Sequence, residues 1–378
     1  MRIGFDAYFA FHYKTGVAHY GRNLINSIAK CYPQTQLILF TDVVTNLYQP
    51  SAPNITVIEL GYEVEYHHWL SHPALLKCVQ NQSTDVFHGL DHGLPSVAGT
   101  REVVTIHDLF FETYPSLYSV AEVEYYKRIA PLACKKADAI ISISQFTKKE
   151  LVGRYHVEER KIKVCYQSCN PLFFQQVTEQ RKDELRKQFD LPSKFWLYVG
   201  SVIARKNLLN ICKALNAIKE ISSTPLMVIG EGSDYLSEVQ QYIRQNRLED
   251  RVRFLSYTDA AKNSASFQQA RDVPAFYQMA LGLLYPSYLE GFGIPLIEAF
   301  ASGLPVITSN TSSLPEIGGD AALYIDPFNV HDIAAALTRV ENDNDLRLSM
   351  IQKGNNIVQH FTEEQTASSV MKVYQQLL

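Results

Sequence analysis

The chain has 378 residues, of which 46% are hydrophobic, 20% charged and 11% aromatic, and its formal net charge is −4. This composition excludes a mainly disordered chain, and the slightly acidic balance argues against a dedicated nucleic-acid binder. At roughly 150 residues per domain, the length favours two to three domains, of which we expect two.

Short runs of β-branched and aromatic residues alternate with longer segments of helical period along the whole chain, a pattern typical of βα units around parallel sheets. The first series of predicted strands covers residues 2–7, 36–40, 55–59, 85–88, 103–107, 139–143 and 162–166. The second series covers residues 195–199, 225–229, 251–255, 281–285, 304–308 and 322–325. We therefore expect two doubly wound α/β domains with a site between them, since ligands of such sheets bind outside the carboxyl ends of the strands.

The two series of strands set the predicted domain boundaries. Residues 171–194 hold no predicted strand and carry a charged helical segment before Pro192, so we assign them as a linker. The N-terminal domain then covers residues 1–170 and the C-terminal domain covers residues 195–360. Apolar residues at helical spacing in residues 361–378 predict a closing helix.

Cysteines and the N-terminal sequence bear on location. The six cysteines lack the paired spacing of zinc sites, so we expect reduced, mostly buried thiols. Residues 1–16 show no basic segment followed by an apolar core, so we expect no signal peptide and a cytoplasmic protein. Residues 127–163 hold ten basic and four acidic side chains, which face solvent, anionic lipid or an anionic substrate.

The segment 285–310, YPSYLEGFGIPLIEAFASGLPVITSN, lies between two predicted buried strands. Gly291 and Gly293 allow the backbone to approach a ligand closely, and Pro295 suits the first turn of a helix that Gly303 ends. The N-terminus of such a helix presents free N–H groups and a positive dipole end. This segment therefore predicts a phosphate-binding helix that starts near residue 295.

Two carboxylates, Glu290 and Glu298, stand in this otherwise apolar segment. Charge in apolar surroundings is costly, so each carboxylate needs hydrogen-bond donors, which the hydroxyl groups of a sugar or ribose would supply. The alternative is a capping glutamate and a solvated helix position.

The residues E-G-F-G-I-P-L-I-E, 290–298, resemble the E-x7-E motif of the retaining family 4 glycosyltransferases, and the resemblance extends over essentially the whole chain. It implies the GT-B fold, in which two Rossmann-like domains face a central cleft. It also implies that Glu290 contacts the donor sugar and that Glu298 holds the ribose hydroxyls. The donor's sugar and phosphates would lie along the backbone of Gly291, Phe292, Gly293 and Ile294.

A pair of cations follows the first strand of the second series, in VGSVIARKN (199–207). Paired basic residues at the carboxyl end of a strand suit a diphosphate. The segment resembles the family's R-K-N motif, which implies that Arg205 and Lys206 stabilise the departing nucleoside diphosphate, with Gly200 beside it. Solvated charges at a helix end are the alternative.

Three residues of the first domain also match the family. His107 and Asp108 end a predicted strand in VVTIHDLFF (103–111), and His107 matches the histidine near the donor sugar. Asp108 either binds the donor or hydrogen-bonds a loop. Gly16 matches the glycine loop that closes over the phosphates, although it also suits a plain helix start.

Other candidate sites are weaker. His88 and His92 stand four residues apart, but neighbouring glycines make a helical metal pair a poor interpretation. GEGSDY (230–235) has a tyrosine where a dinucleotide fingerprint needs a small residue. Residues 255–280 carry about ten extra residues near the place where the family binds the base, counted against the family's usual short loop, which leaves the base preference open.

We predict a cytoplasmic hexosyltransferase that moves a hexose, with retention, from GDP-mannose or UDP-glucose to a hydroxyl of a glycan or lipid-linked acceptor in polysaccharide biosynthesis. No metal or other cofactor is expected, and the nucleotide sugar is a substrate. Residues 127–163 offer a peripheral contact with the inner face of a membrane. The alternatives are a sugar-nucleotide epimerase or phosphorylase on the same fold, or a non-catalytic nucleotide-sugar-binding subunit.

Overall fold

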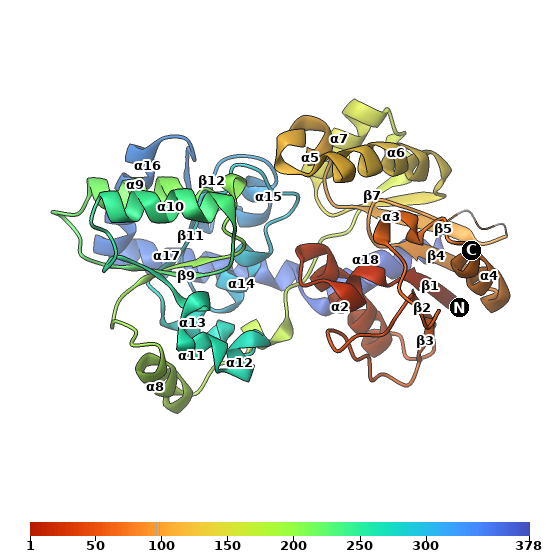
Figure 1. Ribbon diagram of the computed structural model, residues 1–378, viewed down its shortest axis with the longest axis horizontal. Helices are drawn as coiled ribbons and strands as arrows, with labels where there is room; N and C mark the ends of the chain where they lie inside the picture. The colour runs from red at the N-terminus through yellow and green to blue at the C-terminus, as the bar shows by residue number, and fades with distance from the viewer. Residues whose placement is uncertain (96, 98) are drawn as a thin grey trace. The chain divides into compact units, whose positions relative to one another are not determined.

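The computed structural model describes residues 1–95, 97 and 99–378, which form two compact units. Unit 1 consists of residues 1–168 together with 361–378, and unit 2 consists of residues 169–360. Figure 1 shows that each unit is a sheet covered by helices.

The sheet of unit 1 has the strand order β3-β2-β1-β4-β5-β6-β7, and its neighbouring strands pair in parallel. Its strands are β1 (Arg2–Asp6), β2 (Gln36–Thr41), β3 (Ile55–Glu59), β4 (Val86–Gly89), β5 (Arg101–Ile106), β6 (Ala139–Ser142) and β7 (Ile162–Val164). The chain runs from β1 outward to β3 and then returns to pair β4 with the other side of β1. The topological switch point of this sheet therefore lies between β1 and β4.

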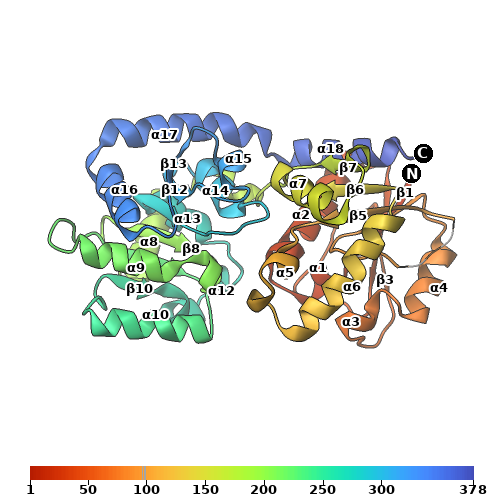
Figure 2. The same ribbon diagram turned by 90° about the horizontal axis from the view of Figure 1, so that it is seen from above.

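Helices cover both faces of the unit 1 sheet. They are α1 (Tyr8–His12), α2 (Gly16–Cys31), α3 (Tyr66–Trp69), α4 (Pro73–Gln82), α5 (Phe110–Thr113), α6 (Val120–Lys136), α7 (Gln145–Tyr155) and α18 (Glu363–Gln375), with the 3-10 turns η1 (Pro115–Leu117) and η2 (Glu159–Lys161). One apolar core joins β5 and β6 to α6 and α7, and another joins β2 to α3 and α4. The last helix of the chain, α18, packs against α2 (Figure 2).

The sheet of unit 2 has the order β10-β9-β8-β11-β12-β13, and its neighbouring strands also pair in parallel. Its strands are β8 (Trp196–Val199), β9 (Leu226–Ile229), β10 (Val252–Phe254), β11 (Gly282–Tyr285), β12 (Val306–Ser309) and β13 (Ala322–Ile325). Here the chain reverses direction across the sheet between β8 and β11, so the loops after these two strands border the switch point.

The helices of unit 2 surround one large apolar core, in which α9 packs against both α10 and α16 (Figure 1). They are α8 (Glu179–Gln188), α9 (Leu208–Ala217), α10 (Asp234–Gln245), α11 (Asp259–Lys262), α12 (Ala265–Gln268), α13 (Val273–Met279), α14 (Ile294–Ala301), α15 (Leu314–Gly318), α16 (Val330–Asn342) and α17 (Asn344–Ile357), with the 3-10 turns η3 (Pro171–Phe174), η4 (Ala204–Lys206), η5 (Leu255–Tyr257) and η6 (Val358–His360).

Each strand predicted from the sequence is present, with its ends shifted by no more than two residues. The charged helix of the predicted linker is α8, which is held on unit 2 by the ion pair between Arg181 and Asp272 at 2.9 Å. The predicted closing helix is α18, which belongs to unit 1. Four of the six cysteines are buried and all six are free thiols. Within the described residues, no helix is both long and apolar enough to cross a bilayer.

Candidate functional site

The switch point of unit 2 gathers the charged residues predicted from the sequence. After β8 the chain passes through Gly200 and η4 to Asn207, and after β11 it passes through Ser287 and Glu290 to the N-terminus of α14. Asn207 joins these loops, because its side-chain amide donates to the carbonyls of Pro286 (3.1 Å) and Pro327 (2.7 Å). The two loops are therefore held in one place at the carboxyl edge of the sheet.

Glu290 lies at the centre of this cluster and is 7% exposed. Its Oε1 accepts hydrogen bonds from the hydroxyls of Tyr285 (2.8 Å) and Ser287 (2.7 Å). The same oxygen lies 2.9 Å from Arg205 Nη1 and 2.9 Å from Lys206 Nζ. Burial alone would raise the pKa of Glu290, but these two cations and the hydrogen bonds lower it to about 2, so the group is ionised at neutral pH.

The two cations are positioned by the same loops. Lys206 also donates to the Tyr285 hydroxyl and lies 4.6 Å from the centre of that ring. Burial lowers the pKa of Lys206, and the nearby Glu290 carboxylate opposes that effect. Arg205 Nη1 donates to the Leu289 carbonyl at 2.9 Å. Two cations and one carboxylate leave a net positive site, which suits a diphosphate.

Helix α14 starts beside this cluster at Gly293, which has φ +118° and serves as the N-cap. A Cβ at Gly293 would lie 2.9 Å from Leu314, so both the backbone and the packing require glycine there. Pro295 follows in the first turn, and Gly303, with φ +68°, comes just after the helix. The predicted helix near residue 295 is thus confirmed, and its first N–H groups face no capping side chain.

Gly200 lies in the same cradle of loops, with φ +136° and the Lys206 side chain 3.6 Å from where its Cβ would be. The next loop of the sheet packs directly onto it, because a Cβ at Gly230 would lie 1.9 Å from the Gly200 carbonyl oxygen. The segment GEGSDY is therefore the loop between β9 and α10 together with the first residues of that helix, and its glycines are required by packing.

Glu298, on α14, accepts one side-chain hydrogen bond from the residues that the structure describes, from the Tyr277 hydroxyl to Oε2 at 2.8 Å. Burial raises the pKa of Glu298 to about 7, and the Tyr277 hydrogen bond and the Lys206 charge only partly oppose this effect. The two glutamates of the segment therefore differ: Glu290 is ionised, with its donors gathered at Oε1, whereas the pKa of Glu298 lies near 7 and its carboxyl has room for further donors.

Sequence reasoning missed the residues that position these carboxylates. Tyr285 and Ser287 stand inside the segment that was singled out, yet only the fold shows that both point to Glu290. Tyr277 comes from α13, and its ring packs against Phe173 at 5.1 Å. The remaining partners are Ser312 and Ser313, which bond the backbone of Glu290. The spacing of hydroxyl-bearing residues around the motif is the only signal that could have found them.

The extra residues predicted near 258–272 form α11 and α12. Phe267, in α12, packs against Phe189 and Phe276 with ring centroids 5.1 and 5.8 Å apart. Just before them, the Ser256 hydroxyl accepts from the backbone N–H of Gly230 at 3.0 Å, and Tyr257 accepts from that of Gly232 at 3.1 Å. Ser256, which stands where the family commonly has glycine, therefore supports the loop after β9.

Two predicted site residues of unit 1, His107 and Asp108, directly follow the strand β5. His107 is 6% exposed, and its Nε2 lies 2.9 Å from the Leu90 carbonyl, to which it donates. Its ring meets Tyr20 edge-on at 5.0 Å. Burial lowers the pKa of His107, and the charge of Asp91 opposes that effect.

The structure shows the local alternative considered for each of Asp108 and Gly16. Asp108 Oδ1 accepts from the backbone N–H of Phe110 (3.0 Å) and from the Tyr118 hydroxyl (3.4 Å), so it does hydrogen-bond its own loop. Gly16 is the first residue of α2, and a Cβ there would meet nothing within 4 Å. Packing within unit 1 therefore does not demand glycine at residue 16.

His88 and His92 do not form a metal pair. His88 Nδ1 lies 2.6 Å from the Tyr374 hydroxyl, and its Nε2 lies 2.8 Å from Thr105 Oγ1. His92 Nδ1 lies 2.5 Å from Asp91 Oδ1. No group of three or more potential metal ligands occurs in the part of the chain that the structure describes.

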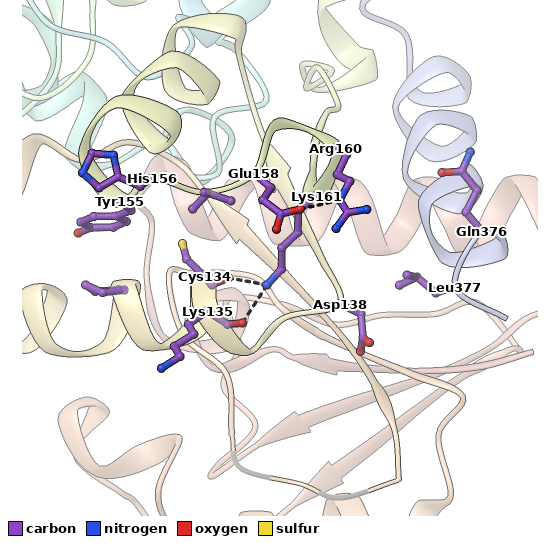
Figure 3. Close-up of a pocket in the computed structure, with 12 residues that line it drawn as sticks. Cys134, Lys135, Asp138, Tyr155, His156, Glu158, Arg160, Lys161, Gln376 and Leu377 are labelled. Carbon is purple, nitrogen blue, oxygen red and sulfur yellow. Dashed lines mark hydrogen bonds and ion pairs between the residues drawn. The ribbon is translucent and has the colours of Figure 1, made fainter.

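Unit 1 also holds a hollow of about 1050 Å³ beneath α6, bordered by Asp138, Glu158, Arg160 and Leu377 (Figure 3). Lys161, drawn there, donates to the carbonyls of Cys134 and Lys135 at the end of α6. The hollow is lined by loops that precede β6 and β7, so it lies at the amino edge of the sheet. Ligands of doubly wound sheets bind at the opposite edge.

Two family models match the chain: "Glycosyltransferase Family 4" over residues 16–171 and "Glycosyl transferases group 1" over residues 180–357. The chain belongs to the family 4 glycosyltransferases. It is 26% identical over 294 residues, 77% of its length and 74% of the relative's, to an O-antigen chain mannosyltransferase B of Escherichia coli. It is 27% identical to the O-antigen chain mannosyltransferase RfbU of Salmonella typhimurium, over 78% and 74% of the two chains.

Solved structures show that this glycosyltransferase has the GT-B fold. A glycosyltransferase from Rickettsia africae matches with a TM-score of 0.76 at 17% identity, covering 100% of this chain and 98% of that one. WaaG, a glycosyltransferase involved in lipopolysaccharide biosynthesis, matches with a TM-score of 0.74 at 16% identity over 99% of both chains.

Proposed function

We propose that this glycosyltransferase moves a hexose from a nucleoside-diphosphate sugar to a hydroxyl group of a glycan or lipid-linked acceptor in polysaccharide biosynthesis, with retention at the anomeric carbon. The observation that carries the proposal is the cluster of Arg205, Lys206 and Glu290 beside the N-terminus of α14. Two cations and free helix N–H groups are what a diphosphate leaving group needs.

The proposed reaction uses no protein nucleophile. The bond between the anomeric carbon and the diphosphate oxygen breaks, and a bond from the acceptor oxygen forms on the same face of the sugar. The acceptor's proton passes to the departing phosphate. Arg205, Lys206 and α14 stabilise the charge that develops on the diphosphate, and Glu290 orients the sugar. No metal or other cofactor is part of this proposal.

The donor we favour is GDP-mannose, with UDP-glucose as the second candidate. The relatives named as O-antigen mannosyltransferases support mannose. A solved structure with UDP-glucose, that of Anabaena HepE, matches with a TM-score of 0.76 at 16% identity and keeps the second candidate open.

The two glutamates give the proposal a paired test. Glu298→Ala should mainly weaken binding of the free nucleotide, since we assign Glu298 to the ribose hydroxyls. Glu290→Ala should spare nucleotide binding and lose transfer, since we assign Glu290 to the sugar. Titration calorimetry and a transfer assay on both variants check the assignment, and exchanged phenotypes would overturn it.

The roles of the unit 1 residues come from the resemblance and are proposals as well. We assign His107 and Asp108 to the donor sugar and Gly16 to the loop over the phosphates. His107→Ala should keep nucleotide binding and lower turnover, measured with the same two assays. Weaker nucleotide binding with unchanged turnover would contradict the assignment of His107.

The proposal includes a peripheral membrane contact through residues 127–163. Five of the ten basic side chains there lie within 4.0 Å of a carboxylate, as Lys136 does with Glu102. Lys161 donates to two backbone carbonyls instead, and among the described residues Arg128, Lys135, Lys149 and Lys163 have neither kind of partner. These four would meet anionic lipid at a cytoplasmic membrane face, and a protein that does not float with anionic vesicles would refute the contact.

Titration of the protein with UDP, GDP, ADP and dTDP in EDTA tests the central proposal. We expect one nucleotide to bind at micromolar concentration without metal, and its base names the donor class. Release of nucleoside diphosphate only when acceptor is present would separate a transferase from an epimerase. Binding without any turnover would refute catalysis and favour a binding subunit.

A further inference from the structure

A groove on the flank of unit 1 brings together two lysines that form no ion pair. It is a cavity of about 220 Å³ between α18 and β7, the last strand of the sheet (Figure 2). Lys163 lines it from β7, and Lys372 lines it from α18. Neither lysine forms an ion pair with a carboxylate in the part of the chain that the structure describes.

The sequence of α18 gives each of its faces a different partner. Its apolar residues are buried. Its two glutamates, Glu363 and Glu364, reach toward α2 and lie 3.0 and 3.8 Å from Lys30. The face that lines the groove carries polar residues at intervals of three and four, which are Gln365, Ser368, Lys372 and Gln376. The helix therefore turns its acidic side chains away from the groove and presents a cation, a hydroxyl and two amides to it.

Strand β7 and the residue after it form the opposite wall. Lys163 and Cys165 stand two residues apart, so their side chains point to the same face of the sheet. The Cys165 thiol and the Ser369 hydroxyl of α18 are hydrogen-bonded, so this is the face that α18 covers. Burial raises the pKa of Cys165 to about 11, which keeps the thiol neutral at physiological pH. The wall therefore adds a second cation and no anion.

The charge of the groove is not compensated by the residues around it. None of the described residues that line it is acidic, although the whole chain has a net charge of −4. The hollow of about 1050 Å³ adjoins it at Gln376 and differs, because Arg160 there lies 2.5 Å from Glu158. Two ammonium groups in one small cavity repel each other, and an anion between them removes that repulsion.

The size and the donors of the groove favour a phosphate group. Lysine ammonium groups bind phosphate as point charges, and the Ser368 hydroxyl and the Gln376 amide can donate to further phosphate oxygens. One water molecule takes about 30 Å³ in the liquid, so a cavity of about 220 Å³ has room for a phosphate group and a few waters.

We propose that the groove between β7 and α18 binds a phosphate group, with Lys163 and Lys372 as its cations and Ser368 and Gln376 as its neutral donors. The site goes beyond the proposed transfer reaction, because all of its residues belong to unit 1 and none to the cluster around Glu290. Two sources share this chemistry, a soluble phosphate ester and the head group of an anionic lipid. The lipid would give the membrane contact proposed for residues 127–163 a defined binding point.

Acetylation of lysines, measured residue by residue by mass spectrometry, tests the site on the full chain. Inorganic phosphate at millimolar concentration should slow acetylation of Lys163 and Lys372, compared with sodium chloride at the same ionic strength. Lys219, an exposed lysine of unit 2 without an ion pair among the described residues, should react equally in both salts. Each lysine is measured separately, so phosphate held at Lys206 does not affect the result.

Two variants show whether the protection comes from one site. Lys372→Ala should raise the phosphate concentration that halves acetylation of Lys163 roughly two- to fivefold, the worth of one exposed charged contact. Lys219→Ala is the matched control and should leave that concentration unchanged. Lys372 is exposed, so its replacement should leave Tm unchanged, which separates lost binding from lost structure.

Glycerol phosphate and vesicles distinguish the two sources. If the ligand is a lipid, phosphatidylcholine vesicles that contain phosphatidate should protect both lysines at a lower phosphate concentration than glycerol phosphate does, and pure phosphatidylcholine vesicles should not protect them. The reverse order would support the site with a soluble ester as its ligand. Equal acetylation of Lys163 in phosphate and in chloride, or protection that Lys372→Ala leaves unchanged, would overturn the inference.

Discussion

The two units share one sheet architecture and use its switch point in opposite ways. In unit 2 the loops after β8 and β11 meet through charge, with Glu290 between Arg205 and Lys206. In unit 1 the loops after β1 and β4 meet through aromatic rings around Asp6 and Asp91. The same βα scaffold thus presents two cations around one carboxylate in one unit and two buried carboxylates held by aromatic side chains in the other, set by a few loop residues.

The two clusters also differ in how complete they are without ligand. The cations of unit 2 already have a partner, because Glu290 lies against both, so the site is held in shape before a diphosphate arrives. In unit 1, Asp91 already accepts hydrogen bonds from Tyr66 and Tyr126, and neither donor is a lysine or arginine. A diphosphate would therefore exchange ion pairs in unit 2, whereas unit 1 has no such ion pairs at Asp91 to exchange.

Removing one of the two cations of unit 2 should have the largest effect on catalytic activity. Lys206→Ala deletes a charge-assisted contact worth about 1.5 to 3 kcal/mol, so kcat/KM should fall roughly ten- to a hundredfold or more. Lys194→Ala is the matched control, because Lys194 pairs with Glu341 at 2.9 Å outside the cluster. A steady-state assay of both variants measures the difference. Unchanged turnover in Lys206→Ala would refute the phosphate role.

The next largest expected effect is a loss of stability when a buried chain of hydrogen bonds in unit 1 is broken. The Tyr374 hydroxyl, on α18, is hydrogen-bonded to His88, and the other ring nitrogen of His88 is hydrogen-bonded to Thr105. Thr105 is in turn hydrogen-bonded to Tyr20, whose ring lies against His107. Burial lowers the pKa of His88 to about 3, so the ring is neutral and needs the tyrosine as its partner. Tyr374→Phe should therefore cost about 1 to 3 kcal/mol of stability.

Tyr125→Phe is the comparison for Tyr374→Phe, since both remove a buried hydroxyl from unit 1. The first hydroxyl lies near Tyr66 without a well-formed hydrogen bond among the described residues, and the second has a partner at 2.6 Å. Urea unfolding of the two variants should give a large loss for Tyr374→Phe and none for Tyr125→Phe. Equal losses would mean that the hydrogen bond to His88 contributes little.

The elements of the fold were predictable because buried parallel strands form short apolar runs bounded by polar loops. Arg205, Lys206 and Glu290 were predictable as well, since charges between buried strands stand out, and the structure brings them together. Their partners were not: Tyr277 lies 21 residues before Glu298, and only tertiary packing joins them. Asp6 and Tyr125 were missed because one lies inside the predicted strand 2–7 and the other precedes the basic segment 127–163 and belongs to no motif.

The glutamates of unit 2 should respond differently to pH. Burial raises the pKa of Glu298 to about 7. The contribution of Glu298 to the free energy of unfolding is therefore fully present below the unfolded pKa of about 4.5, and it is lost as the pH rises through 7. Glu298→Gln should therefore gain Tm relative to wild type between about pH 5 and about pH 8.

Glu290 supplies the contrast to Glu298. Its pKa is lowered to about 2, so its share of stability is present above about 4.5 and is lost only as pH falls toward 2. The Tm deficit of Glu290→Gln should thus stay constant between about pH 5 and about pH 8. Parallel pH profiles for the two variants would show that the two carboxylates do not differ in protonation.

The smallest expected change in stability and activity comes from Gly16, at the start of α2 in unit 1. A Cβ at Gly16 meets nothing within 4 Å, and the same holds for Gly153 in α7. Replacing either glycine by alanine removes backbone freedom from the unfolded chain, so both variants should gain up to about 1 kcal/mol of stability. If a donor phosphate approaches the backbone at residue 16, only Gly16→Ala should lose kcat/KM while it gains Tm. Retained turnover in both variants would make Gly16 a plain helix-start glycine and would leave phosphate recognition to unit 2.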